Sequence, residues 1–303
     1  MICEFFIDHH GRSDSVQLSN LLSTLRPIAL HRLTDRDLAD WISRRQKRLS
    51  GGWARRSGMT EKNRRRLAVF RDPQHVRDLL LLPYRLLKRA EAGTLPPIDA
   101  ARLVRTAVAI ELEIMSPIRL QNLSEINVET DLIRSRSGKG ATVHLFIPGK
   151  RTKNGEDIEL ELPAPSVALI DLYLAKYRNQ LIDPEFRGTS PRFLFPRADG
   201  TAKVGRMLAD AICTVLRREL GTKFNVHLFR HLSCFLYLRS HPGQMDVMRR
   251  VLGHRNEETT RRFYSYVEQS DAFRLFDANV LRIREDALRP RQKAPAPRKG
   301  SKR

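Results

Sequence analysis

Long hydrophobic runs are missing from the sequence. A membrane-spanning helix needs about 18 or more consecutive apolar residues, whereas the densest apolar stretch, Leu79–Leu82, ends at Pro83. Met1–His10 also lacks the basic region and the long apolar segment of a secretory signal. These absences exclude a membrane span and predict a cytoplasmic protein.

Cysteine is equally scarce. The chain has 3 cysteines, Cys3, Cys213 and Cys234, whose spacing provides neither a disulfide framework nor a CxxC metal site. The sequence also offers no cluster of carboxylates for Mg²⁺. We therefore expect a metal-independent protein.

Acidic residues are outnumbered by basic ones. Among 303 residues, 55 Lys and Arg stand against 34 Asp and Glu, which gives a net charge of +21. A hydrophobic content of 41% is still that of a globular protein, so most of the chain should bury a core. A surface of this sign attracts polyanions. Nucleic acid is the first partner class to expect, and an anionic membrane surface is the second.

The positive charge is concentrated in two stretches. Residues 44–71 contain eleven basic side chains and one acid, Glu61. Residues 287–303 contain seven basic side chains, three prolines and no acid, a composition that predicts a disordered basic tail. A solvated face in an arginine-rich protein is the alternative explanation for the first stretch.

Apolar periodicity predicts a mainly α-helical body with a small antiparallel β-sheet, that is, an α+β fold. The expected helices are 33–47 with Thr34 as its N-cap, 73–92 broken near Pro83, 99–115, 166–178, 204–220, 227–239, 245–252 and 271–283. Alternation at 143–147 and 158–162 predicts two strands joined by a loop. A turn at 93–97 is a candidate domain boundary.

Five short motifs follow one another along the body. Each occurs by chance in many proteins, but together they supply two arginines, a lysine, two histidines and a tyrosine. The motifs are Met115–Leu123 with Arg119, the loop lysine Lys153, His227-Leu-Phe-Arg230 followed by His231, Leu252-Gly253-His254, and Thr259–Val267 with Tyr264.

This set of side chains suits transesterification at a phosphodiester. A tyrosine hydroxyl has a pKa of about 10 and needs a base or a cationic pocket to act as a nucleophile. Arg119 and Arg230 can each present a planar fork to the non-bridging oxygens and stabilise the transition state. Lys153 is the candidate for protonating the departing 5′ oxygen, His227 for proton transfer and His254 for binding the phosphate.

The ordered motifs resemble those of tyrosine recombinases of the phage integrase family, over residues 100–267. The resemblance implies a catalytic domain at 93–286, a 3′-phosphotyrosine intermediate and no cofactor. It also implies duplex DNA as the partner and a tetramer that exchanges strands on two recombination sites through a Holliday junction. Such an enzyme would be associated with the nucleoid and would belong to a mobile element. Residues 1–92 then form a basic, helical DNA-binding region that is short for a complete DNA clamp.

The chain departs from the family pattern around the first arginine. Pro117 stands where the family usually has Gly, and Asn122 where it usually has an acid. Asn122 can still orient Arg119 through a hydrogen bond, but it adds no charge.

The tyrosine and the lysine each have rivals. Many members carry the tyrosine nine residues after the last histidine, where this chain has Phe263. Tyr264 follows directly and is the predicted nucleophile, with Tyr266 as the alternative. On the hairpin loop, Lys150 and Arg151 compete with Lys153. His231 is expected to be structural rather than catalytic.

Two other functions remain open. A type IB topoisomerase uses a similar set of side chains, although His227 and His254 together favour a recombinase. A decayed integrase that only binds DNA would keep the basic stretches and lose cleavage.

We predict that deletion of residues 287–303 reduces the salt dependence of DNA binding. Each phosphate neutralised on B-DNA contributes about −0.9 to the slope of log K against log salt concentration. Fluorescence anisotropy of a labelled duplex at several salt concentrations measures this slope. An unchanged slope would show that the tail does not contact DNA.

Overall fold

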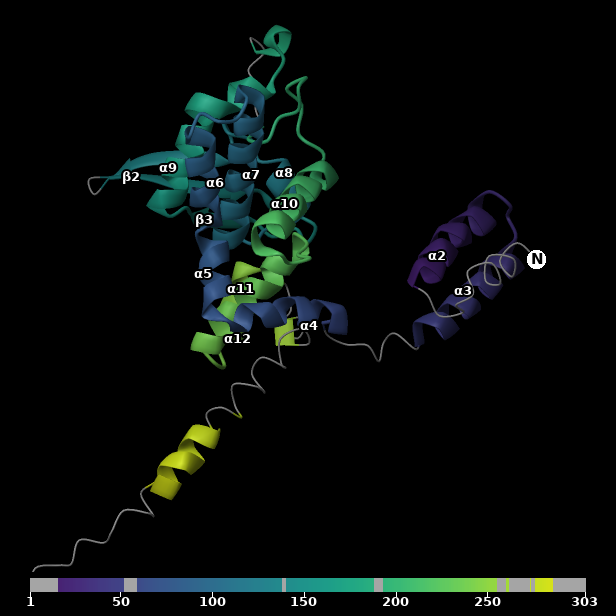
Figure 1. Cartoon of the computed structure of the whole chain (residues 1–303). Helices are drawn as coiled ribbons and strands as arrows, with labels where there is room; N and C mark the ends of the chain where they lie inside the picture. The colour runs from purple at the N-terminus through teal and green to yellow at the C-terminus, as the bar shows by residue number, and fades with distance from the viewer. Residues whose placement is uncertain are drawn as a thin grey trace, which may run out of the picture. The chain divides into compact units, whose positions relative to one another are not determined.

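The computed structural model describes residues 16–51, 59–137, 140–187, 193–254, 260–261, 273 and 276–285. Backbone contacts divide the chain into two compact units, Met1–Met59 and Thr60–Arg303 (Figure 1). The basic stretch 44–71 is shared between the two units, and the basic tail 287–303 lies outside the described residues.

The first unit contains two helices that pack along each other, α2 (Val16–His31) and α3 (Arg36–Gly51). Their contact buries a small apolar core of Leu22, Ala29, Ala39 and Ile42. The sequence predicted α3 but not α2, in which Pro27 interrupts an otherwise helical pattern.

Asp35, rather than Thr34, caps the start of α3. Asp35 Oδ1 accepts a hydrogen bond from the backbone N–H of Leu38 at 2.9 Å, which is the bond that an N-cap side chain makes. Thr34 has a φ of +50° and belongs to the turn before the helix. The predicted cap is therefore wrong by one residue.

The second unit is mainly helical. Its helices are α4 (Glu61–Ala68), α5 (Pro73–Leu80), α6 (Leu82–Glu91), α7 (Pro97–Met115), α8 (Leu120–Ser124), α9 (Ala164–Leu172), α10 (Gly205–Leu220), α11 (His227–Ser240) and α12 (Met245–Val251). A π-helical turn, Tyr173–Tyr177, and short 3₁₀ turns at Val69–Arg71, Gly149–Arg151, Arg178–Leu181 and Pro184–Phe186 complete it. Within the described ranges, no helix has the length and apolar character to cross a membrane.

Helix α7 forms the centre of this unit. Every side chain from Leu103 to Glu113 is buried, because α6, α9, α10 and α11 all pack against the helix (Figure 1). The sequence predicted this central position from apolar residues on more than one face. The predicted break near Pro83 is also present: α5 and α6 meet at Leu81, and Pro83 lies in the first turn of α6.

A three-stranded antiparallel sheet accompanies the helices, in the order β1 (Leu132–Ser137), β2 (Gly140–Ile147) and β3 (Ile158–Glu161). In β2, Val143, Leu145 and Ile147 are buried, as their alternation predicts. The predicted combination of helices with a small antiparallel sheet is confirmed. Strand β1 was not predicted, because its sequence Leu-Ile-Arg-Ser-Arg-Ser has only two apolar residues.

Residues 60–92 belong to the second unit. The ring of Phe70 packs edge-on against Phe224 at a centroid distance of 5.5 Å, and Phe224 packs in the same way against Phe229 of α11 at 4.9 Å. The boundary predicted at residue 92 thus lies inside this unit, in the turn between α6 and α7.

Two glutamates near the end of α7 have different surroundings. Glu113 is 1% exposed, and neither of its carboxylate oxygens has a hydrogen-bond partner among the described residues. Burial raises its pKa well above the usual value, and the nearby Arg230 acts in the opposite direction with a smaller effect. Glu111, also buried, accepts hydrogen bonds from the hydroxyls of Ser166 at 2.6 Å and Tyr84 at 3.3 Å.

We predict that Glu113→Met stabilises the second unit by about 1–3 kcal/mol, because it removes a buried polar group that lacks a partner. The matched control Glu111→Met should be destabilising, since two hydroxyls lose their acceptor. Urea unfolding followed by circular dichroism measures the stability of both variants. Tryptophan fluorescence would not report on the second unit, because both tryptophans precede residue 60.

The pH dependence provides a second readout. The folded state holds the Glu113 proton more tightly than the unfolded state, so wild-type stability should fall as pH rises through the raised pKa. The Met variant should lose this dependence. Equal destabilisation by Glu113→Met and Glu111→Met would contradict the conclusion that Glu113 is a buried carboxyl group without a partner.

Candidate active site

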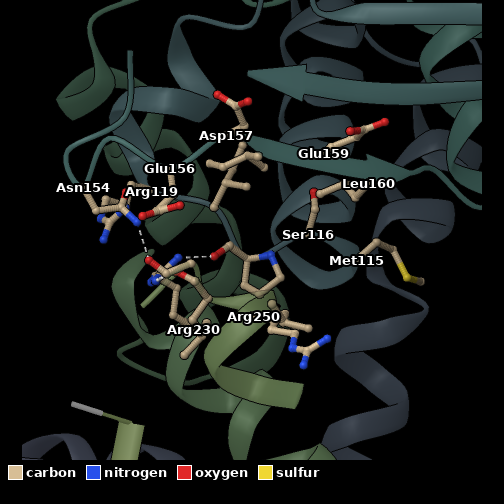
Figure 2. Close-up of a pocket in the computed structure, with 16 residues that line it drawn as sticks. Met115, Ser116, Arg119, Asn154, Glu156, Asp157, Glu159, Leu160, Arg230 and Arg250 are labelled. Carbon is tan, nitrogen blue, oxygen red and sulfur yellow. Dashed lines mark hydrogen bonds between the residues drawn. The ribbon is translucent and has the colours of Figure 1, made fainter. Parts of the chain in front are cut away.

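A cleft of about 330 Å³ opens where the end of α7, strand β3, α11 and α12 come together. Figure 2 shows Arg119 and Asn154 side by side on one wall, with Arg230 next to them. The lining consists of Met115–Arg119, Asn154, Glu156–Leu160, Arg230 and Arg250–Gly253. The two predicted arginines therefore share one cleft.

Arg119 is oriented by the side chain of Asn154. Its backbone is extended, with φ −73° and ψ 142°, and it directly precedes α8. Arg119 Nη1 donates to Asn154 Oδ1 at 3.1 Å, and Asn154 Nδ2 donates to the carbonyl oxygen of Gly253 at 2.5 Å (Figure 2). The Asn154 amide thus connects Arg119 to the chain just after α12. Asn154 was not among the predicted site residues; the Asn-Gly pair indicated only a turn.

Asn122 does not have the role expected from the sequence. Its side chain is buried, and Nδ2 lies 3.5 Å from the carbonyl oxygen of Arg151. The amide that binds Arg119 is therefore that of Asn154.

Arg230 is the most buried cation of the cleft, with 6% of its surface exposed. It lies in the first turn of α11, where its Nη1 donates to the carbonyl oxygen of Pro117 at 2.5 Å and its Nη2 to that of Leu252 at 2.6 Å. These two carbonyl oxygens offset part of the cost of burying the Arg230 charge.

His254 is placed by the end of α12. Gly253 has a φ of +57°, which a residue with a Cβ adopts only with strain, and the backbone N–H of His254 donates to Arg249 O at 2.9 Å. The sequence predicted this glycine-terminated helix. His254 Nε2 lies 3.4 Å from Arg230 Nη2, and Nδ1 lies 3.0 Å from Thr260 Oγ1.

Burial, and after it the positive surroundings, lowers the pKa values of the site histidines and keeps them neutral at neutral pH. Burial first, then the charges of Arg230, Arg119 and His227, lowers the pKa of His254 to about 4. A neutral His254 that accepts from Arg230 at Nε2 carries its proton on Nδ1, facing Thr260.

The histidines of α11 form a pair. The rings of His227 and His231 pack edge-on at a centroid distance of 4.9 Å. His227 is exposed at the start of the helix, and desolvation followed by the charges of Arg230 and Arg119 lowers its pKa. His231 is 5% exposed, and burial followed by the charges of its histidine and arginine neighbours lowers its pKa to about 4.

The loop between β2 and β3 is tied across its base. A Cβ on Gly149 would lie 2.4 Å from Gly155 O, so the two chain segments approach as closely as glycine permits. Gly149 N donates to Asp157 Oδ1 at 2.6 Å, and Thr152 Oγ1 lies 2.8 Å from Glu156 O.

The three cations of this loop have different surroundings. Arg151 is engaged in the structure: its Nη1 donates to Asp131 Oδ1 at 2.7 Å, and its Nη2 donates to Glu125 O at 2.7 Å. Lys150 and Lys153 are exposed. Lys153 lies next to Asn154, but it is not among the residues that line the cleft.

The predicted nucleophile Tyr264, its neighbour Phe263 and the alternative Tyr266 lie outside the described residues. The described residues bring together Arg119, Arg230 and His254.

Chemically, the part of the cleft formed by Arg119 and Arg230 favours a bound oxyanion, whereas the carboxylates of Glu156, Asp157 and Glu159 also line the cleft. Guanidinium groups at its wall supply planar donors, and a phosphate oxygen is the acceptor that such donors match best. In the described part of the chain, no three His, Cys, Asp or Glu side chains converge in a way that would hold a metal ion.

We predict that the second unit loses stability as pH falls from 6.5 towards 4. The pKa values of His231 and His254 are about 4 in the folded state and higher when unfolded, so the unfolded state takes up more protons in this range. Circular dichroism in urea at several pH values measures the effect.

His231→Gln should remove up to about 3 kcal/mol of the loss between these pH values. His31→Gln, on the separate first unit, is the control and should leave the loss intact. A His231 variant with the wild-type pH profile would show that this histidine is already protonated in the folded protein.

Comparison with known proteins gives matches only among solved structures; no protein-family model and no curated protein sequence matches the chain. The chain is similar to the XerH site-specific recombinase bound to its palindromic difH substrate in a post-cleavage complex, with 16% identity and a TM-score of 0.47 over 65% of this chain and 50% of that one. For XerH bound to difH in a pre-cleavage complex, the identity is 16% and the TM-score 0.44, over 59% of this chain and 47% of that one. For the XerA recombinase, the identity is 13% and the TM-score 0.43, over 95% of this chain and 90% of that one. The match to XerH thus spans half of the length of that protein or less.

Proposed function

We propose that this chain is a site-specific DNA recombinase of the tyrosine recombinase type, which cuts and rejoins DNA through a 3′-phosphotyrosine intermediate. The observation that carries the proposal is that Arg119 and Arg230 line one cleft, and that His254, which directly follows Gly253 of the lining, lies 3.4 Å from Arg230. The motif order in the sequence supports it independently.

Arg119 is suited to hold the scissile phosphate. Its guanidinium has five N–H donors, and Asn154 fixes the orientation of the group through one of them. Donors held in place before the reaction stabilise the developing charge without further reorganisation. Arg230, anchored on two carbonyls, brings a second cation to the same oxygens.

In the proposed reaction, the Tyr264 hydroxyl oxygen forms a bond to phosphorus and the bond from phosphorus to the 5′ oxygen breaks. His227 accepts the tyrosine proton, which its lowered pKa allows because the ring is neutral at pH 7. Lys153 donates a proton to the departing 5′ oxygen. His254 binds the phosphate through the tautomer that carries its proton on Nε2, once the phosphate replaces this ring nitrogen as an acceptor for Arg230. Attack by a 5′ hydroxyl of a second strand reverses these steps, so no energy-supplying cofactor is needed.

The remaining assignments follow the same proposal. The basic region within residues 1–92 and the basic tail bind duplex DNA, and the catalytic domain lies within the second unit, to which residues 60–92 also belong. Four protomers act together on two recombination sites, at the nucleoid.

We predict that Tyr264→Phe abolishes covalent attachment to DNA, while folding and DNA affinity stay unchanged, because the substitution removes one oxygen and keeps the ring. A library of nicked duplexes with randomised sequence is incubated with the protein, denatured, and examined for DNA that remains attached to protein. Sequencing of the attached DNA also identifies the preferred site.

Tyr266→Phe is the matched control and should still form the adduct. Loss of the adduct in Tyr266→Phe and its retention in Tyr264→Phe would move the nucleophile by two residues. If the wild-type protein binds the library and forms no adduct, the chain binds DNA without cutting it and the proposal fails.

A further inference from the structure

A second group of cations lies away from the cleft, on the N-terminal half of α7 and on a short hairpin beside it. Arg102 and Arg105 are three residues apart on α7, so their side chains leave the same face of the helix. Arg197 and Lys203 belong to the hairpin 194–203, where Pro196 and Ala202 form a β-bridge.

Arg105 is buried, and one nitrogen of its guanidinium has no hydrogen-bond partner among the described residues. Its side chain is 9% exposed, and its Nε has no acceptor in the part of the chain that the structure describes. Burial lowers the pKa of this guanidinium. An unpartnered buried cation is costly unless an anion reaches it.

The hairpin brings Lys203 to the same place. Lys203 N donates to Phe195 O at 2.8 Å and Arg197 N to Thr201 O at 2.8 Å, so the side chains of Arg197 and Lys203 lie on one face of the hairpin. Tyr173, which interacts electrostatically with Arg105, donates its hydroxyl to Leu194 O at 3.0 Å and holds the hairpin against this part of the unit.

Positive charge is not balanced at Lys203, although two of its cationic neighbours have an acid nearby. Burial, followed by the charges of Arg105, Arg102 and Arg197, lowers the pKa of Lys203 to about 8, and no acid counteracts these charges at the ammonium group. Asp99 pairs with Arg102 at 3.1 Å, and Asp199 lies near Arg197. Residues 188–192, which precede the hairpin and lie outside the described ranges, contain no acid in their sequence.

We propose that Arg105 and Lys203, together with Arg102 and Arg197, form a binding site for a phosphate group. Guanidinium forks beside an ammonium point charge are the combination that proteins use to bind phosphate. Arg105 is ten residues before Met115 on one straight helix, which separates this site from the cleft by about 15 Å along α7. The phosphate site is separate from the proposed cleavage and rejoining of DNA, and phosphate can bind there whether or not the chain cuts DNA.

A backbone phosphate of duplex DNA and a free phosphate share this chemistry, and two measurements on the full chain distinguish them. The first is the salt dependence of binding to a mixed-sequence duplex. The second is the melting temperature with inorganic phosphate or chloride at equal ionic strength. The variants are Lys203→Gln, the charge-conserving Lys203→Arg, and the control Lys176→Gln, an exposed lysine of the π-helical turn.

For a DNA phosphate, Lys203→Gln should make the slope of log K against log salt shallower by about 0.9, while Lys203→Arg and Lys176→Gln keep the wild-type slope. For a free phosphate, the anion should raise the melting temperature of the wild type and of Lys176→Gln but not of Lys203→Gln. Neither measurement needs cleavage, so a chain that fails to form a covalent adduct can still pass both.

Without phosphate, Lys203→Gln should melt at the wild-type temperature or above it, because it removes a charge held among like charges. A lower melting temperature would show that Lys203 stabilises the fold instead. Identical behaviour of Lys203→Gln and Lys176→Gln in both measurements would also overturn the proposal.

Discussion

The site depends on one buried guanidinium. Arg230 donates to the carbonyl oxygens of Pro117 and Leu252, and a buried cation that lost either acceptor would carry a large desolvation cost. Helix α11 therefore fixes the segment after α7 and the end of α12 at the same time. Arg119 is two residues after the first carbonyl and His254 two residues after the second, so the positions of both follow from these contacts.

The elements that the sequence predicted are those whose pattern is set by their own burial. Helix α7 has apolar residues on more than one face and is buried from Leu103 to Glu113, and strand β2 alternates because one face is covered. Strand β1 and helix α2 were not predicted. Strand β1 has few apolar residues and is ordered by backbone pairing with β2, and α2 is supported by its contact with α3. Such support comes from outside the segment, so its own sequence does not show it.

The same distinction applies to the site. The positions of Arg230 and Gly253 follow from local helix patterns and were predicted. The bridge that Asn154 makes between Arg119 and Gly253 reaches back 35 positions in the chain to Arg119 and forward 99 positions to Gly253, and no local pattern indicates it. Among the loop cations, the sequence favoured Lys153 and left Arg151 as a rival. In the structure Arg151 is paired with Asp131, whose side chain is 2% exposed.

The closed base of the loop between β2 and β3 determines how its tip can move. Gly149 and Gly155 leave no room for a side chain between them, and the Asp157 carboxylate holds the backbone at the crossing. Motion of the whole loop, on the order of nanoseconds to microseconds in proteins, would have to break this crossing. Lys153 instead changes the position of its ammonium group by rotation about its own side-chain bonds, on the order of picoseconds to nanoseconds. In the proposed reaction, the position of the proton donor would therefore be set by the rotamer populations of Lys153 and not by motion of the whole loop.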